Sequence, residues 1–278
     1  MKKILFFLIT ILIVTSIFSQ NSSTRILTYN IRYANNNPGE EWSVRKSNVS
    51  EMIRFHHPEI FGVQEALLEQ IDFLKSEFTN YTQVGVGRED GKVGGEFSAL
   101  FISNNFEIIE SGTFWLSETP DVPSKGWDAS LNRIASWAII KNKFVDETFM
   151  VVNTHFDHIG IVARSESAKL IMTKINELSI GLPSILMGDF NFNSSFEGYK
   201  YINDFDLLKD SETISKYRYG TDITFNGFQD DLTNREKIDF IFVSEKINVL
   251  HHAVIGDKFD NKYPSDHMPV IIDFKIDK

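Results

Sequence analysis

The chain of 278 residues contains no cysteine, which excludes disulfides, zinc–thiolate sites, iron–sulfur clusters and thiol nucleophiles. Basic residues are scarce as well, because 28 Lys and Arg stand against 38 Asp and Glu, a formal net charge of −10. Proteins that bind nucleic acid non-specifically rely on clustered Lys and Arg, so this charge argues against such a role. It still allows a nuclease, because a metal ion can neutralise phosphate locally.

Long apolar runs are also missing, apart from Ile4–Ile17 near the N-terminus. Two lysines precede this run and small residues follow it, which is typical of a secretory signal peptide over residues 1–20. A retained membrane anchor is the alternative, but a spanning helix needs roughly twenty apolar residues. We therefore expect an exported protein, periplasmic or secreted, with one mature domain over residues 21–278.

The rest of the chain has an ordinary globular composition, with 42% hydrophobic and 24% charged residues. Short apolar runs suited to buried strands alternate with amphipathic helical patterns, which predicts two sheets with helices outside them. The expected strands are Ile26–Tyr29, Ile60–Val63, Ala99–Ile102, Ser136–Ile140, Phe149–Val152, Ser184–Met187, Ile238–Val243 and Val270–Phe274, and the expected helices are Val44–Phe55, Ala66–Phe78 and Ile161–Leu178.

Four polar loops rich in Gly, Pro, Asn and Asp are long enough to help shape a substrate cleft. They are Asn35–Glu41, Arg88–Gly95, Ser117–Ser130 and Asn226–Glu236.

Residues able to bind metal or transfer protons stand at the ends of several expected strands. Five such positions, with carboxylate, amide and imidazole groups, predict that these strand ends share one face of the protein. The segments are Asn30, Gln64-Glu65, Asn153-Thr154-His155, Gly188-Asp189-Phe190-Asn191 and Ser265-Asp266-His267.

Asp239 lies in an apolar run, where a buried carboxylate without a partner would cost on the order of several kcal/mol. We expect a histidine partner, and the alternative is an edge position facing solvent.

Asp189 and Asn191 point the same way on extended chain and could hold a water and a phosphoryl oxygen, although such a sequence is also a common turn. The pair His251-His252 has no supporting acid and is expected at the surface.

The ordered segments resemble the endonuclease/exonuclease/phosphatase superfamily, whose members include deoxyribonuclease I and nocturnin-like deadenylases. The resemblance spans residues 29–267 and implies an α/β fold, a four-layer α/β/β/α sandwich with two central mixed sheets. The matching segments are Tyr29-Asn30-Ile31-Arg32, Gln64-Glu65, Asn153-Thr154-His155, Gly188-Asp189-Phe190-Asn191, Lys237-Ile238-Asp239-Phe240-Ile241 and Ser265-Asp266-His267.

The resemblance also implies a metal site. Glu65 looks like the principal metal carboxylate, with Asn30 beside it and Asp266 as the ligand of a second site. These oxygen donors, with imidazole nearby and no sulfur, favour Mg²⁺ or Mn²⁺ over zinc.

The remaining roles concern water and phosphate. Asp189 resembles the residue that orients or deprotonates the attacking water, and Asn191 the residue that holds that water or a phosphate oxygen. The resemblance gives His267 a contact with the scissile phosphate, with Asp239 fixing its tautomer.

His155 resembles a second active-site histidine, and Glu96 is its expected carboxylate partner.

A second block, including Thr113–Pro120 and Lys125–Ala129, is similar to the nocturnin-like branch and to exported bacterial relatives. Arg133 could bind a phosphate or an acidic substrate group, or instead pair with Asp128 or Glu118. Asn132 could also face the site, and Trp127 could line the cleft or simply pack. In Trp42-x-x-Arg45 we favour a structural role.

The implied reaction is metal-dependent hydrolysis of a phosphodiester or phosphomonoester by in-line attack of water. Nucleic acid, nucleotides, phospholipid headgroups, inositol phosphates and phosphorylated glycans remain open as substrates. The alternative is a non-catalytic binding module on the same fold, which would be expected to lack Glu65, Asp189 or His267. We expect a monomer without stable membrane insertion.

Overall fold

The computed structural model describes residues 23–204 and 207–277. The expected signal peptide lies outside these described residues. Within them, no helix combines the length and apolar character needed to cross a membrane.

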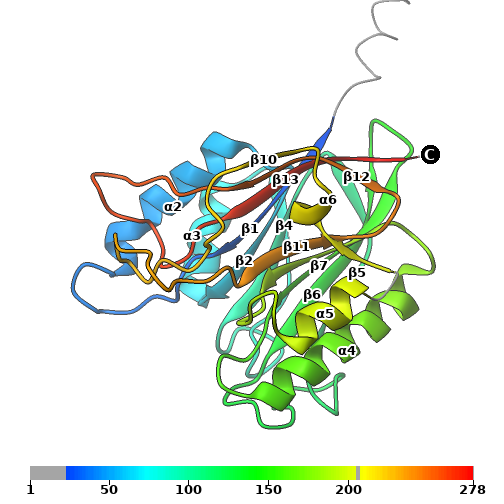
Figure 1. Ribbon diagram of the computed structural model, residues 1–278, viewed down its shortest axis with the longest axis horizontal. Helices are drawn as coiled ribbons and strands as arrows, with labels where there is room; N and C mark the ends of the chain where they lie inside the picture. The colour runs from blue at the N-terminus through cyan, green and yellow to red at the C-terminus, as the bar shows by residue number, and fades with distance from the viewer. Residues whose placement is uncertain (1–22, 205–206, 278) are drawn as a thin grey trace, which may run out of the picture.

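Two mixed sheets form the centre of the described chain (Figure 1). The first has seven strands, in the spatial order β10 (Tyr217–Tyr219), β12 (Ile247–Val254), β13 (Val270–Ile276), β1 (Thr24–Asn30), β2 (Ile60–Ala66), β4 (Phe97–Ser103) and β3 (Tyr81–Val84). The second has six, in the order β5 (Phe106–Trp115), β6 (Ile134–Asn142), β7 (Thr148–His155), β8 (Ser184–Asp189), β11 (Asp239–Val243) and β9 (Lys209–Asp210).

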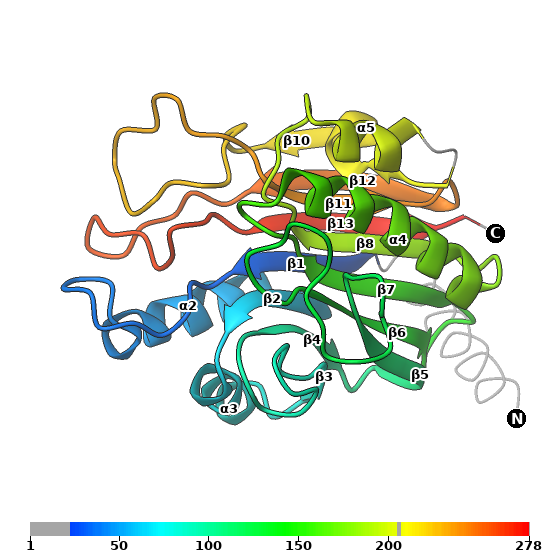
Figure 2. The ribbon, with the colours of Figure 1, turned by 90° about the horizontal axis from the view of Figure 1, so that it is seen from below.

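Helices cover the outer faces of both sheets, so the four expected layers are present (Figure 2). Side chains of α2 (Trp42–His56) and α3 (Leu68–Glu77) form one apolar cluster with the first sheet. Side chains of α4 (Ile161–Ser179) and α5 (Glu197–Asp204) form another with the second sheet. A third cluster fills the space between the sheets, and the short helix α6 (Ser211–Ile214) contacts β11 and β12.

Strand pairing brings the polar strand ends to one edge of the sandwich. In the first sheet β1 and β2 are parallel, with Asn30 opposite Gln64. In the second, β7 and β8 are parallel with His155 opposite Asp189, and β11 runs antiparallel to β8 with Asp239 also opposite Asp189. Gly188 permits the close pairing, because a Cβ there would lie 2.0 Å from the Thr154 carbonyl oxygen. The expectation of a shared face is confirmed.

One expectation about histidines was wrong, because His252 is buried with 3% of its surface exposed. A bulge in β12 between Val249 and His251 shifts the alternation by one residue, so His251 faces solvent and His252 faces inward. The Nδ1 atom of His252 lies 3.0 Å from Ser211 Oγ. Burial, aided by the positive charge of Lys237, lowers the pKa of His252 to about 3.

We expect His252 to make the protein less stable in acid. In the unfolded chain His252 binds a proton below its ordinary pKa of 6.5. In the folded protein it stays neutral until the pH falls to about 3. The free energy of unfolding therefore falls by about 1.4 kcal/mol per pH unit across this window, or about 2 kcal/mol between pH 6.5 and 5. Urea unfolding at pH 7 and pH 5 should show that His252→Gln loses this component, whereas the exposed neighbour variant His251→Gln keeps it. Equal pH dependence in both variants would refute the assignment.

Candidate active site

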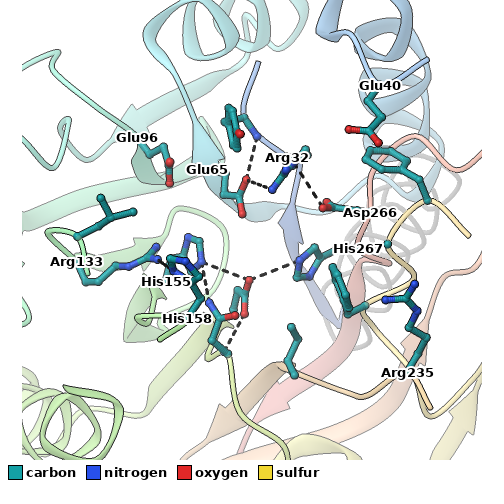
Figure 3. Close-up of a pocket in the computed structure, with 18 residues that line it drawn as sticks. Arg32, Glu40, Glu65, Glu96, Arg133, His155, His158, Arg235, Asp266 and His267 are labelled. Atoms are coloured by element: carbon teal, nitrogen blue, oxygen red, sulfur yellow. Dashed lines mark hydrogen bonds and ion pairs between the residues drawn. The ribbon is translucent and has the colours of Figure 1, made fainter. Parts of the chain in front are cut away.

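The polar strand ends line a cavity of about 700 Å³ at this edge of the sandwich (Figure 3). Of the residues expected in the site, eight line it: Glu65, Glu96, Arg133, His155, Asp189, Asn191, Asp266 and His267. Asn30 and Asp239 are buried directly behind it, at 0% and 1% exposure, and hydrogen bond to residues of the cavity wall.

Glu65 reaches the cavity because β2 is irregular where it ends. The register between β2 and β4 shifts between Val63 and Ala66, and Glu65 has a φ of 62°, in the left-handed region. Arg32 and Asn191 also have left-handed backbones, with φ of 57° and 50°. Non-glycine residues held in this region cost of order 1–3 kcal/mol each and concentrate at functional sites. The strain supports a functional reading of this edge.

Asn30 links the two sheets at the floor of the site. Its amide nitrogen donates to Glu65 Oε1 at 3.1 Å and to Asp189 Oδ2 at 2.9 Å. Its amide oxygen accepts from the backbone N–H of Arg32 at 3.0 Å. Asn30 therefore lies beside Glu65 as expected, but it presents a hydrogen-bond donor to the site rather than a ligand oxygen.

His267 is held between two carboxylates. Its Nδ1 lies 2.8 Å from Asp239 Oδ2, and its Nε2 lies 3.7 Å from Asp189 Oδ2. Burial alone would lower the pKa of His267, but these two carboxylates outweigh it and raise the pKa to about 10. The ring therefore carries a positive charge at neutral pH.

Asp189, Asp239 and His267 offer ligand atoms that all lie within 4.8 Å of one another, close enough for one metal ion. The hydrogen bond between His267 and Asp239 already occupies Nδ1 of the ring and Oδ2 of the carboxylate. We therefore interpret the group as a hydrogen-bonded relay. Burial, followed by the charge of Asp239, raises the pKa of Asp189 to about 7.

His155 differs from His267 in charge. Burial and the nearby guanidinium groups of Arg133 and Arg88 hold the pKa of His155 well below its ordinary value of 6.5. Its Nε2 lies 3.0 Å from the Asn191 amide nitrogen and 3.5 Å from Asp189 Oδ2. Asp189 thus lies beside one neutral and one positively charged imidazole.

A cation fits between Glu65 and Asp266. The Arg32 guanidinium lies there now, with Nη1 3.6 Å from Glu65 Oε2 and Nε 3.6 Å from Asp266 Oδ2. Neither distance is that of a good hydrogen bond, and Arg32 Nε is buried with no hydrogen-bond partner among the described residues. The two carboxylates therefore hold the Arg32 guanidinium only loosely. Their oxygens are ligands of the kind that Mg²⁺ and Mn²⁺ prefer. Glu65 and Asp266 are therefore the residues that would hold such an ion.

Arg45 fixes the segment that carries Arg32 and the loop that carries Asp266, and it has the structural role expected of it. It is 3% exposed and donates to the carbonyls of Ile31 at 2.9 Å and Pro264 at 2.8 Å. It also donates to the carbonyls of Glu40 and Arg32.

The expected pairing of Glu96 with His155 is wrong. Both oxygens of Glu96 accept from Arg88, at 2.6 and 3.0 Å. Arg88 follows β3 in a loop that folds back beside β4, and its bidentate guanidinium satisfies the carboxylate better than a neutral imidazole could. Glu96 therefore lines the cavity as half of an ion pair.

Arg133 also has a different partner from those expected. It is 4% exposed and its Nε lies 3.4 Å from Asp157 Oδ2, so it pairs with neither Asp128 nor Glu118. Its Nη2 lies 3.0 Å from His158 Nδ1, while Nη1 is buried and has no hydrogen-bond partner in the part of the chain that the structure describes. This free donor in the cavity wall remains suited to an anionic ligand.

Two expected substrate contacts do not line the cavity. Asn132 instead donates to the Arg88 carbonyl at 3.3 Å and to Glu89. Trp127 is half-buried, and its backbone N–H donates to Glu118. Both belong to the loop leading into β6, in which Leu131 and Arg133 line the cavity instead.

Sequence reasoning missed several residues of the cavity wall. Arg32 belongs to a segment that carries the family resemblance, but the resemblance assigns it no role. His158 follows His155 in the next loop. Phe225, Phe228 and Arg235 lie within or beside the polar loop Asn226–Glu236. That loop's length was the one available signal, since isolated aromatic and basic residues carry no pattern.

Comparison with known proteins agrees with this geometry. A sequence model of the endonuclease/exonuclease/phosphatase family matches residues 27–267. The chain is 41% identical to a solved protein of that family from Bacteroides thetaiotaomicron, with a TM-score of 0.89 over 93% of this chain and 100% of the other. It is also 41% identical to a solved mannosyl-6-phosphatase of Bacteroides thetaiotaomicron, with a TM-score of 0.89 over 91% of this chain and 100% of the other.

The human nocturnin catalytic domain has the same fold, at 20% identity and a TM-score of 0.72 over 91% of this chain and 93% of that domain. The resemblance drawn from the strand-end residues is thus confirmed, as is the two-sheet sandwich. The chain belongs to the endonuclease/exonuclease/phosphatase family, whose members are hydrolases acting on phosphate esters.

Proposed function

We propose that the protein is an exported, Mg²⁺- or Mn²⁺-dependent phosphatase, active as a monomer, that releases phosphate from a sugar phosphate monoester. The observation that carries the proposal is the cavity itself. It brings a carboxylate pair able to hold a cation, a charged His267 and the proton-accepting Asp189 to one point. A non-catalytic binding module would not need the carboxylate pair, the charged histidine and the proton acceptor together.

The residues of the cavity have complementary tasks in this reaction. A bound divalent ion would neutralise phosphate charge and stabilise the leaving oxygen. Asp189 accepts the proton of the attacking water, and its two neighbouring imidazoles limit where that water can lie. His267 donates a charged hydrogen bond to a phosphoryl oxygen, while Asp239 fixes its orientation. The Asn30 amide holds Glu65 and Asp189 at their positions.

The substrate class is supported by the 41% identity to a protein described as a mannosyl-6-phosphatase. The cavity also suits a monoester, which carries more charge than a diester. His267, Arg133 and Arg32 all present positive groups to it.

We expect purified protein in Mg²⁺ to hydrolyse 4-nitrophenyl phosphate with a kcat/KM at least about tenfold above that for bis(4-nitrophenyl) phosphate. The two esters share a leaving group, so nitrophenolate absorbance reports both reactions directly. A preference for the diester would contradict the phosphatase assignment while leaving the phosphoesterase class intact. It would direct the substrate search to nucleic acids and phospholipids.

A further inference from the structure

The cavity extends past His267 into a second region whose residues the proposed reaction does not use. Figure 3 shows Arg235 on the far side of His267 from Arg133. The walls of this second region come from Phe225, Gly227, Phe228 and Arg235, around the polar loop that the sequence singled out.

Arg235 is a cation aimed into this region, and no carboxylate of the described residues lies within ion-pair distance of it. Its guanidinium carbon lies 5.3 Å from the Phe225 ring centroid, a cation–π contact. Its side chain is half-buried. Local hydrogen bonds, aided by the charge of Arg235, lower the pKa of Asp231, an exposed residue of the same loop. Gly227 makes room for it, because a Cβ there would lie 2.9 Å from Arg235 Nη1.

The loop that carries Phe225 is bound to the catalytic segment. Phe225 forms a β-bridge with His267, and their rings lie 5.1 Å apart. The backbone N–H groups of Asn226 and Gly227 both donate to the Asp266 carbonyl, at 2.8 and 3.0 Å. The Asn226 side chain donates to the Ser265 carbonyl at 3.1 Å. The ring on which Arg235 stacks is thus held at a fixed place beside His267.

The other two arginines that line the cavity each have a protein carboxylate within 4 Å. Arg133 lies 3.4 Å from Asp157, and Arg32 lies between Glu65 and Asp266. A partly buried guanidinium that no carboxylate contacts is best satisfied by an anion from the ligand, since its fork of donors matches phosphate and carboxylate. Neutral hydroxyl groups alone would not require the charge.

We propose that Arg235, seated on Phe225, forms a subsite for a second anionic group on the alcohol part of the substrate. The preferred substrate is then a sugar phosphate that carries another phosphate or a carboxylate away from the ester that is cleaved. This inference rests on the proposed phosphatase function and narrows its substrate.

The test compares phosphate release from three probes of one carbon skeleton in Mg²⁺. Glucose 6-phosphate has no second anion, glucose 1,6-bisphosphate has a second phosphate, and 6-phosphogluconate has a carboxylate. We expect the kcat/KM of at least one doubly anionic probe to exceed that of glucose 6-phosphate about tenfold. Which of the two probes gains more identifies the anion.

In Arg235→Gln the kcat/KM of the doubly anionic probe should fall to nearly that of glucose 6-phosphate, a ratio near one. In Arg235→Lys this ratio should be intermediate, because lysine keeps the charge but lacks the paired donors of the guanidinium. Arg54→Gln is the matched control, because Arg54 is exposed, pairs with Glu77 and lies outside the cavity. Equal values for all three probes in the wild type would overturn the subsite, as would an unchanged ratio in Arg235→Gln, while leaving the phosphatase function standing. No phosphate release from any probe would overturn the proposed function and the subsite together.

Discussion

Replacing Asp189 by asparagine is expected to lower kcat at least about a hundredfold with little change in folding, because general-base catalysis contributes this much or more. Asparagine has nearly the same shape and can still contact Asn30, His155 and His267. It cannot accept a proton from water. The loss should therefore lie in kcat rather than in KM, measured as phosphate release under saturating substrate at pH 7.

The matched control for this substitution is Asp121→Asn, which removes one carboxylate from an exposed loop. It should leave kcat close to the wild-type value. Thermal unfolding of both variants would show whether the fold is intact. A near-wild-type rate in Asp189→Asn would mean that another group accepts the proton, and the role given to Asp189 would be wrong.

Glu65→Ala is expected to abolish the stabilisation of the protein by Mg²⁺. A ligand that binds the folded state alone stabilises it by about 2.7 kcal/mol at a concentration a hundred times its Kd. With Glu65 removed, Asp266 is left without the second carboxylate of the pair, and the Arg32 guanidinium is then free to pair with Asp266 alone. The thermal midpoint of wild-type protein should rise with Mg²⁺ concentration, and that of Glu65→Ala should stay constant.

Glu96→Ala provides the control within the same cavity. Glu96 is the same residue type, but both of its oxygens are bound by Arg88. The variant should therefore keep its response to Mg²⁺ even if its starting stability changes. If Glu65→Ala responded as strongly as wild type, the ion would have to bind elsewhere, and the relay of Asp189, Asp239 and His267 would become the first place to look.

The layers of the fold follow from sequence patterns that depend on burial. Strands inside the sandwich are covered on both faces, so β2, β7 and β8 are continuous apolar runs that are easy to find. Two strands with an exposed face, β5 and β12, were not predicted from the sequence. In β5, exposed glutamates interrupt the apolar pattern, and in β12 a bulge shifts it. Such interruptions depend on neighbours distant in sequence, which a local pattern does not contain.

The residues of the site also differ in how well the sequence predicts them. Residues at strand ends, such as Glu65 and Asp189, could be predicted because the sheet fixes where they point. Glu96 could not be paired correctly, since its partner Arg88 comes from a loop whose path no periodicity describes. Arg235 was missed for the same reason, because its position depends on the ring of Phe225 and the space left by Gly227.

Metal-dependent release of phosphate is the most direct test of the proposed function. Purified residues 21–278 would be assayed with mannose 6-phosphate in Mg²⁺, then in EDTA, then after Mg²⁺ is restored, with Asp189→Asn as the blank. We expect wild-type turnover that disappears with EDTA and returns with Mg²⁺, and we expect the Asp189→Asn variant to release phosphate at least about a hundredfold more slowly. Turnover that persists in EDTA, or that Asp189→Asn retains, would contradict a metal-dependent phosphatase at this cavity.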